Sequence, residues 1–344
     1  MKLRFLVFTF SFLVLFASCE KALMPQEAPD SPTAVFDHLW QQVDTRYSLF
    51  DVKGVDWQQV YDTLRTKVSD DISDDSLFSL CAAMLSTLRD GHVNLYNDND
   101  ISHSDSIIYH FYHDSQIDID AIVLGYLGTN YHSTGGIAHQ ALDGGRVAYL
   151  RYGSFSSTIT VSQLRHILRS YPDAQGLILD IRGNGGGAIT NIHNLLSILP
   201  SHGQHLYSSQ IKAGPAHDQF TPLTPSYAPE VDDSNAFQGP VVVLIDRGCY
   251  SASSLFALCC QAYPSVILVG DTTGGGLGLP ATFLLPNGWR YRISVTRLLS
   301  PQGQNFENGV PPHHLVHLDR QAALTRYKDN IIDTAITIIN TLTH

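Results

Sequence analysis

Beyond residue 145, short apolar runs alternate with longer segments whose apolar residues recur every three or four positions. The short runs predict buried strands at residues 147–152, 176–181, 241–245 and 266–269. The longer segments predict helices at residues 161–171, 189–199 and 251–263. Such alternation is typical of right-handed βαβ units around a largely buried sheet. The fold class is therefore predicted to be α/β, with residues 145–344 as its core.

The segment before this core follows a different pattern. Apolar residues at helical spacing predict three helices, at residues 33–47, 55–69 and 75–88. These helices predict a small N-terminal helical domain over residues 33–96. Residues 97–144 are polar, aromatic and without a clear period, so an irregular connection is expected there.

Three further features lie within the core. Residues 281–285 and 289–296 flank Pro286-Asn287-Gly288, which predicts a hairpin. Residues 320–341 predict a last helix. Residues 201–238 are rich in Pro, Ser and Asp, and are expected to form a long connection able to shape a substrate cleft.

The N-terminus has the features of an export signal. Two positive charges precede an apolar run over residues 5–16, which is too short for a usual membrane-spanning helix. Ala17-Ser18-Cys19 then resembles a bacterial lipoprotein box. Residues 1–18 are accordingly predicted to be a signal peptide, Cys19 the lipidated residue, and residues 19–32 a tether to the membrane. The predicted location is the bacterial cell envelope; plain secretion is the alternative.

Composition narrows the possible partners and cofactors. The net charge of −11 argues against nucleic acids and anionic membrane surfaces as partners. Apart from Cys19, the cysteines are Cys81, Cys249, Cys259 and Cys260, too scattered for a disulfide scaffold. No Cys/His spacing indicates a structural zinc site, so neither metal nor cofactor is expected.

Two turns that follow predicted strands contain the candidate chemistry. Ser251 lies between an apolar strand and a helix, beside N–H groups that can stabilise an oxyanion. The alternative is an ordinary helix-capping serine. The other turn, residues 183–187, has four glycines in five positions and no Gly-Lys-Ser/Thr, so it is not a nucleotide P-loop. Together the turns predict a nucleophile and an oxyanion hole, with Cys249 as a weaker alternative nucleophile.

This ordered pair of motifs resembles the tail-specific, or C-terminal processing, serine peptidases. The shared residues are Asp180, Arg182, Asn184 and the glycines of the first motif, and Ser251-Ala252-Ser253 of the second. The resemblance implies a ClpP/crotonase-like core. Many members of this family have a PDZ domain inserted before this core, but residues 97–135, about forty in number, are too few for one, so no PDZ insertion is expected. The better-known branch uses a Ser-Lys dyad, but Gly276 stands at the matching lysine position.

The chain instead resembles the tricorn-like branch, which is related to the interphotoreceptor retinoid-binding repeats. Residues 88–93 match the motif of its catalytic histidine and residues 305–312 that of its glutamate. The resemblance implies a triad of Ser251, His92 and Glu307, with Glu307 acting directly or through an intervening residue. The implied oxyanion donors are the N–H of Ala252 and that of Gly185 or Gly186. Without the resemblance, His92 would be an ordinary histidine and Glu307 a surface carboxylate.

These features predict an exported, lipid-anchored serine endopeptidase that acts on peptides or proteins through an acyl-enzyme. A non-catalytic ligand-binding homologue of the same fold is the main alternative. Acyl-CoA chemistry is a third possibility, which the export signal disfavours.

Overall fold

A seven-stranded sheet forms the centre of the computed structural model, which describes residues 29–103, 115–232 and 236–344. The strands lie in the order β13-β9-β8-β5-β4-β3-β2. Their bounds are β2 His132–Thr134, β3 Ile137–Leu142, β4 Val147–Tyr152, β5 Gly176–Asp180, β8 Val241–Ile245, β9 Val266–Gly270 and β13 His314–Leu315. The strands from β4 to β13 are parallel, whereas β2 and β3 add antiparallel strands at one edge. The predicted α/β class is confirmed.

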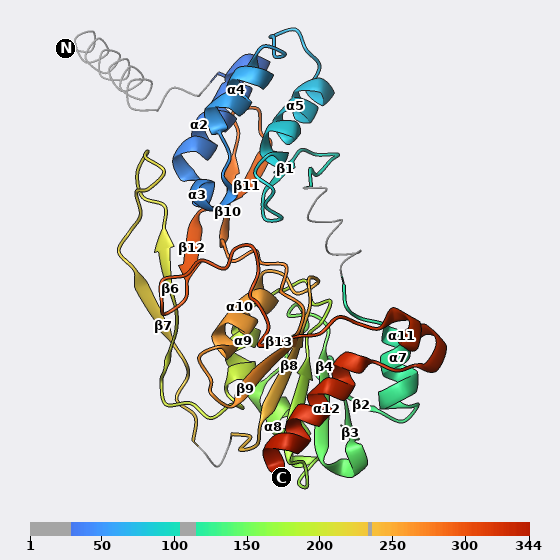
Figure 1. Cartoon of the computed structure of the whole chain (residues 1–344). Helices are drawn as coiled ribbons and strands as arrows, with labels where there is room; N and C mark the ends of the chain where they lie inside the picture. Colours follow the sequence, from blue (N-terminus) through green and yellow to red (C-terminus); the bar gives the residue numbers. More distant parts are fainter. Residues whose placement is uncertain (1–28, 104–114, 233–235) are drawn as a thin grey trace, which may run out of the picture.

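Helices cover both faces of this sheet (Figure 1). One face packs against α8 Val161–Arg169, α9 Ile189–Leu196 and α10 Ala252–Cys260. The other face packs against α7 Ile119–Ile122, α11 Arg320–Arg326 and α12 Asn330–Thr343. Because both faces are covered, β5 and β8 are buried at every position and are apolar without alternation, apart from Asp180 at the end of β5.

The two motif-bearing turns follow neighbouring parallel strands. In the β5–β8 pairing Asp180 lies opposite Leu244, so both strands end at the same edge of the sheet. The turns that follow are joined directly, because the Tyr250 N–H donates to the Asn184 carbonyl at 3.1 Å. Parallel topology therefore brings together two segments far apart in the chain, at the edge where open α/β sheets bind ligands.

A helical region forms the opposite end of the molecule (Figure 1). Its helices are α2 Pro32–Arg46, α3 Phe50–Lys53, α4 Trp57–Arg65 and α5 Asp74–Ser86. They pack on an antiparallel sheet of order β1-β11-β10, with bounds Asn94–Tyr96, Arg290–Ser294 and Pro280–Leu284. The predicted hairpin is confirmed as β10 and β11. Its Tyr291 and Ile293 lie in the core of the helical region, so the predicted boundary at residue 145 does not separate the two parts in space.

A third sheet has two of its three strands within residues 201–238, for which a long connection is predicted. It has the order β12-β6-β7, with bounds Thr296–Leu299, His205–Ile211 and Thr224–Tyr227. The expectation for residues 201–238 is wrong over these strands. The pairing of β6 with β12 joins residues that are distant in sequence, and a polar local composition gives no sign of it.

Two more expectations differ from the structure. Residues 97–144 contain, besides α7, β2 and β3, a π-helix Val123–Leu127 and a 3₁₀ turn Asp143–Gly145, so the expectation of an irregular connection is wrong there. The antiparallel strand β3 is only half buried, which weakens its apolar signal. The predicted last helix is two helices, because Tyr327 adopts a left-handed conformation with φ of 53° and Asp329 caps a new helix.

No helix in the described ranges is long and apolar enough to cross a membrane. The predicted signal peptide, residues 1–18, and Cys19 lie outside the described residues. Cys81, Cys249, Cys259 and Cys260 are all buried free thiols.

Candidate active site

Ser251 lies in a sharp turn between β8 and α10, with φ of 59° and ψ of −119°. A non-glycine residue seldom adopts positive φ, and strained residues of this kind gather at functional sites. The turn is held by two backbone hydrogen bonds: the Ser251 N–H to the Gly275 carbonyl, and the Leu255 N–H to the Ser251 carbonyl, each 2.9 Å. The Ser251 side chain makes no capping bond to the helix, so the helix-cap alternative does not apply.

His92 is the partner of the Ser251 hydroxyl. Its Nε2 lies 3.0 Å from Ser251 Oγ, although the two residues are 159 positions apart in the sequence. The turn after α5 carries His92, and the Asp90 carboxylate accepts the His92 backbone N–H at 2.8 Å. Only 5% of His92 is exposed. The histidine and serine chosen from sequence are thus brought together in hydrogen-bonding distance.

Tyr250 fills the space that a Ser-Lys dyad would need. Gly276 has φ of 73°, and a Cβ atom placed there would meet the Tyr250 ring at 2.3 Å. The same ring packs against His92, with 5.2 Å between ring centroids. A side chain at Gly276 is therefore excluded both by backbone conformation and by contact. Sequence reasoning noted the missing lysine but not the aromatic ring in its place.

Glu307 is buried but does not contact His92 directly. Its Oε2 accepts the backbone N–H groups of Leu277 and Gly278, at 2.7 and 2.8 Å. Its Oε1 lies 3.1 Å from Lys53 Nζ, in an ion pair with both side chains buried. The pKa of Glu307 is raised to about 7, mainly by burial and then by the charge of Asp90, against the opposing charge of Lys53. Glu307 therefore binds the backbone at Leu277 and Gly278, and not the histidine itself.

Charges around His92 set its protonation. Burial lowers the pKa of His92, the Asp90 carboxylate opposes this, and the positive charge of Arg292 lowers the pKa further. The backbone of Gly278 raises it, while Nδ1 of His92 has no hydrogen-bond partner in the described part of the chain. The imidazole is therefore neutral near pH 7, the form that accepts a proton.

Asp90 is a residue that sequence reasoning missed, although it lies within the histidine motif. Besides the His92 N–H, its carboxylate accepts hydrogen bonds from the Tyr47 hydroxyl at 3.1 Å and the Ser294 hydroxyl at 2.8 Å. Two distant segments, at Tyr47 and Ser294, therefore hold the turn that carries His92. Nothing in the local sequence distinguishes such a buried carboxylate from an exposed one.

The glycine-rich loop approaches Ser251 closely. A Cβ atom on Gly186 would lie 2.6 Å from the Tyr250 carbonyl oxygen, so only glycine fits. The Gly186 N–H already donates to the Asn184 side chain at 3.0 Å. Gly187 lines the cavity beside Ser251, and so does Ala252 at the start of α10.

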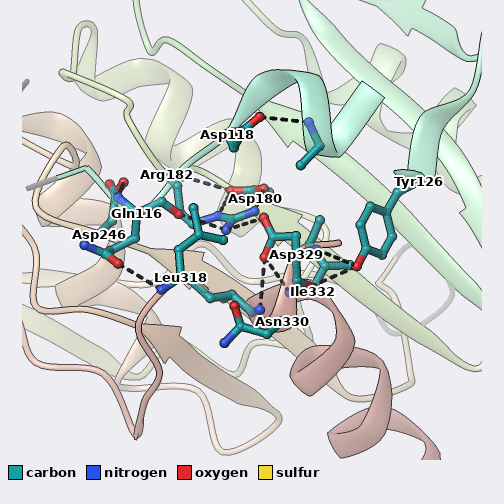
Figure 2. A network of polar contacts seen from close by, with 12 residues as sticks. Gln116, Asp118, Tyr126, Asp180, Arg182, Asp246, Leu318, Asp329, Asn330 and Ile332 are labelled. Atoms are coloured by element: carbon teal, nitrogen blue, oxygen red, sulfur yellow. Dashed lines mark hydrogen bonds and ion pairs between the residues drawn. The ribbon is translucent and has the colours of Figure 1, made fainter. Parts of the chain in front are cut away.

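Behind the loop lies a buried polar network around Arg182 (Figure 2). Arg182 is completely buried and donates to both oxygens of Asp180, at 3.0 and 2.6 Å. It also donates to Asp329 at 2.8 Å and to the Gln116 carbonyl at 3.0 Å. Asp329 in turn caps α12 through the Ile331 and Ile332 N–H groups. The Asp-x-Arg part of the motif therefore anchors the loop and does not reach Ser251.

A cavity of about 300 Å³ opens onto Ser251 and His92. Its walls are mostly aliphatic, with Ile189, Leu255 and Leu298 among them, and Arg292 also lines it. Cys249, the alternative nucleophile, does not line this cavity. It is buried with its thiol donating to the Ile181 carbonyl at 3.0 Å, and burial raises its pKa. A protonated, enclosed thiol is a poor nucleophile.

Comparison with known proteins identifies the family of this chain. The profile of peptidase family S41 matches residues 146–316, and that of the tricorn protease C1 domain matches residues 29–86. A solved structure of a peptidase candidate from Parabacteroides merdae is 33% identical, covers 90% of this chain and 97% of its own, and has a TM-score of 0.83. The chain belongs to peptidase family S41. The predicted resemblance to C-terminal processing peptidases of the tricorn-like kind is confirmed.

More distant relatives match part of the chain or the fold alone. The carboxy-terminal processing protease CtpB of Bacillus subtilis is 24% identical over 178 residues, which are 51% of this chain and 35% of the relative. The chain thus spans little more than a third of the length of the curated relatives it matches. The solved tricorn protease is 15% identical with a TM-score of 0.52; the match covers 92% of this chain and 37% of that chain, and shows the fold alone.

Proposed function

We propose that this chain is a serine peptidase that hydrolyses peptide bonds through an acyl-enzyme formed on Ser251. The observation that carries the proposal is the 3.0 Å contact between His92 Nε2 and Ser251 Oγ at the wall of a cavity. His92 accepts the serine proton as Oγ attacks the scissile carbonyl carbon, and returns it to the leaving amine. In the second half of the reaction His92 accepts a proton from water, which attacks the ester carbonyl carbon, and the proton returns to Ser251 Oγ as the acid product leaves.

The oxyanion would bind two backbone N–H groups. Ala252 supplies one, at the N-terminus of α10, where the first N–H groups have no partner within the helix. For the other, the sequence pointed to Gly185 or Gly186. We assign it to Gly187, because the Gly186 N–H is engaged by Asn184 and Gly187 lines the cavity.

Glu307 completes the triad through the backbone. Its carboxylate holds the N–H groups of Leu277 and Gly278, and the backbone of Gly278 in turn raises the pKa of His92. The glutamate would thus orient the peptide that orients the imidazole, with Lys53 fixing the carboxylate. This arrangement supports His92 as base, whereas a Ser-Lys dyad has no room at Gly276.

The fold assignment and the location of the chain belong to the same proposal. We infer a ClpP/crotonase-like core without a PDZ insertion, from the motif pair and the parallel sheet. We infer an exported protein anchored by a lipid at Cys19, from the residues that precede this cysteine. Its substrates would be peptides or proteins, in keeping with the names of the processing proteases it resembles, and the anchor would place them outside the cytoplasm.

Peptide hydrolysis tests the activity. A pool of unstructured peptides is incubated with the protein, and new termini are identified by mass spectrometry. Ser251→Ala should abolish cleavage, while Ser86→Ala, an exposed serine on α5, should retain it. Equal cleavage by Ser251→Ala and the unaltered chain would contradict the proposal.

Expression in a bacterial host tests the anchor. Cys19→Ser should move the protein from the membrane fraction to the soluble fraction, because the thiol that carries the lipid is gone. Cys81→Ser, a change at a buried thiol, is the control and should leave the partition unchanged. A mature N-terminus elsewhere than Cys19 would disprove the anchor.

A further inference from the structure

Arg292 is the one formally charged side chain among the residues that line the cavity at Ser251. It lies on β11, the central strand of the sheet β1-β11-β10. Its cross-strand neighbours are Asn94 on β1 and Thr282 on β10, neither of which carries a charge. Within the described residues, its guanidinium has no carboxylate within 4.0 Å and no hydrogen-bond acceptor.

The alternation of β11 directs Arg292 toward the site. Tyr291 and Ile293 point into the core of the helical region, so Arg292 belongs to the opposite face. Ser294, on that same face, donates to the Asp90 carboxylate beside His92. Arg292 and His92 line the same cavity, and the positive charge of Arg292 lowers the pKa of His92, after the larger effects of burial and Asp90.

Other arginines near the site differ from Arg292 in having partners. Arg182 binds two carboxylates, Arg297 pairs with Asp51 at 3.0 Å, and Arg247 donates to the carbonyls of Thr273 and Asn308. A half-buried cation without a partner, on a mostly aliphatic wall, is costly for the unoccupied protein unless a ligand supplies the counter-charge. Guanidinium groups bind carboxylates with two parallel hydrogen bonds, which provide both energy and orientation.

We propose that Arg292 selects substrates that carry a carboxylate close to the bond that is cleaved. The inference rests on the proposed peptidase function and specifies its substrate class. The carboxylate is an Asp or Glu side chain or the C-terminal carboxylate of the peptide, and the residue beside it is aliphatic. Leu255, Leu279 and Leu298 line the same cavity and bind that apolar neighbour.

Binding to Ser251→Ala tests the inference without any turnover. Acetylated and amidated Ala/Leu hexapeptides carry a single Asp at each position in turn; a second set has Asn, and a third has Asn with a free C-terminal carboxylate. Kd is measured by calorimetry. At least one Asp position or the free carboxylate should bind about tenfold more tightly than its neutral counterpart, as expected for one charge-assisted hydrogen-bonded pair. Tighter binding of an Asp peptide would show that Arg292 binds a side-chain carboxylate. Tighter binding of the peptides with a free C-terminus would show that it binds the end of the chain.

Variants of the arginine show whether it causes the preference. Arg292→Leu, combined with Ser251→Ala, should reduce the ratio of Kd for the neutral peptide to Kd for its carboxylate counterpart to about one. Arg292→Lys should keep part of this preference for the carboxylate. Arg290→Leu is the matched control on the same strand, with an exposed side chain outside the cavity, and should keep the full ratio. Equal binding of charged and neutral peptides, or a preference that survives Arg292→Leu, would overturn the inference.

The two proposals fail in different ways. If the chain with Ser251 cleaves none of these peptides while the carboxylate preference depends on Arg292, the peptidase proposal fails and the binding site stands. If the peptides are cleaved with no preference for a carboxylate, the peptidase proposal stands and Arg292 has no part in selection.

Discussion

The two sides of the glycine-rich loop differ in how completely their polar groups are satisfied. Behind the loop, Arg182 is fully buried and every neighbouring carboxylate is matched by donors. In front of it, Ser251 has strained backbone angles, and Arg292 lacks an acid partner among the described residues. Satisfied buried groups specify a structure, whereas strained or unmatched ones indicate where a reacting molecule binds. The difference predicts which substitutions affect activity and which affect stability.

The largest effect is expected for His92→Ala. Removing a general base costs about two to four orders of magnitude in kcat. The free energy of unfolding should change little, because His92 lies at the cavity and its buried turn is held by Asp90. His166→Ala, an exposed histidine on α8, should leave kcat unchanged. Near-normal kcat in His92→Ala would show that another group activates Ser251.

The next effect is on stability and comes from the Arg182 network. Arg182→Met leaves Asp180 and Asp329 buried without their cation, and should cost about 3–5 kcal/mol of unfolding free energy. Arg146→Met removes the partly exposed pair with Asp143 and should cost at most about 1 kcal/mol. Urea unfolding followed by circular dichroism measures both. Similar small losses of unfolding free energy in the two variants would mean that the Arg182 network does not stabilise the fold.

A smaller effect on activity is expected for Glu307→Gln. Gln keeps an oxygen for the Leu277 and Gly278 N–H groups but loses the charge opposite Lys53. Its kcat should fall by about tenfold, less than that of His92→Ala. Adding Glu307→Gln to His92→Ala should cost little more than His92→Ala alone, since members of a triad act as a unit. Multiplicative losses would place Glu307 outside the triad.

The smallest effect is a shift of the acid limb of the pH profile. The pKa of His92 lies below its ordinary value of 6.5, so kcat/KM should rise through a pH below 6.5 and level off above it. Asp90→Asn removes a negative charge that raises this pKa, and should move the limb to lower pH. Arg292→Leu removes a positive charge that lowers it, and should move the limb to higher pH. Arg290→Leu is the control and should not move the acid limb. Shifts in the same direction for Asp90→Asn and Arg292→Leu would contradict the assignment of this limb to His92.

Much of the fold follows from local patterns, and two of the three residues of the proposed triad follow from short motifs that resemble those of a known family. β4 and β8 have the bounds that their apolar runs predict. Both strands are buried on both faces, so each is apolar nearly throughout and its bounds are clear from the sequence. His92 and Ser251 belong to compact motifs, and the structure brings them within hydrogen-bonding distance.

Residues whose importance depends on distant contacts could not be predicted in the same way. Lys53 lies in the short helix α3, yet it pairs with Glu307 near the other end of the chain. Arg292 is one of three arginines in close succession, and only the position of β11 relative to the cavity distinguishes it. The sheet β12-β6-β7 was missed for the same reason, since its pairing is set by tertiary packing and not by local periodicity.

The central claim is that His92 makes Ser251 a nucleophile, and covalent labelling tests it most directly. The protein is treated with a fluorophosphonate, which captures activated serines, and the modified residue is mapped by peptide mass spectrometry. One adduct is expected, on Ser251, formed at least about a hundredfold more slowly in His92→Ala and absent in Ser251→Ala. An adduct on another residue, or labelling that persists in Ser251→Ala, would contradict the claim.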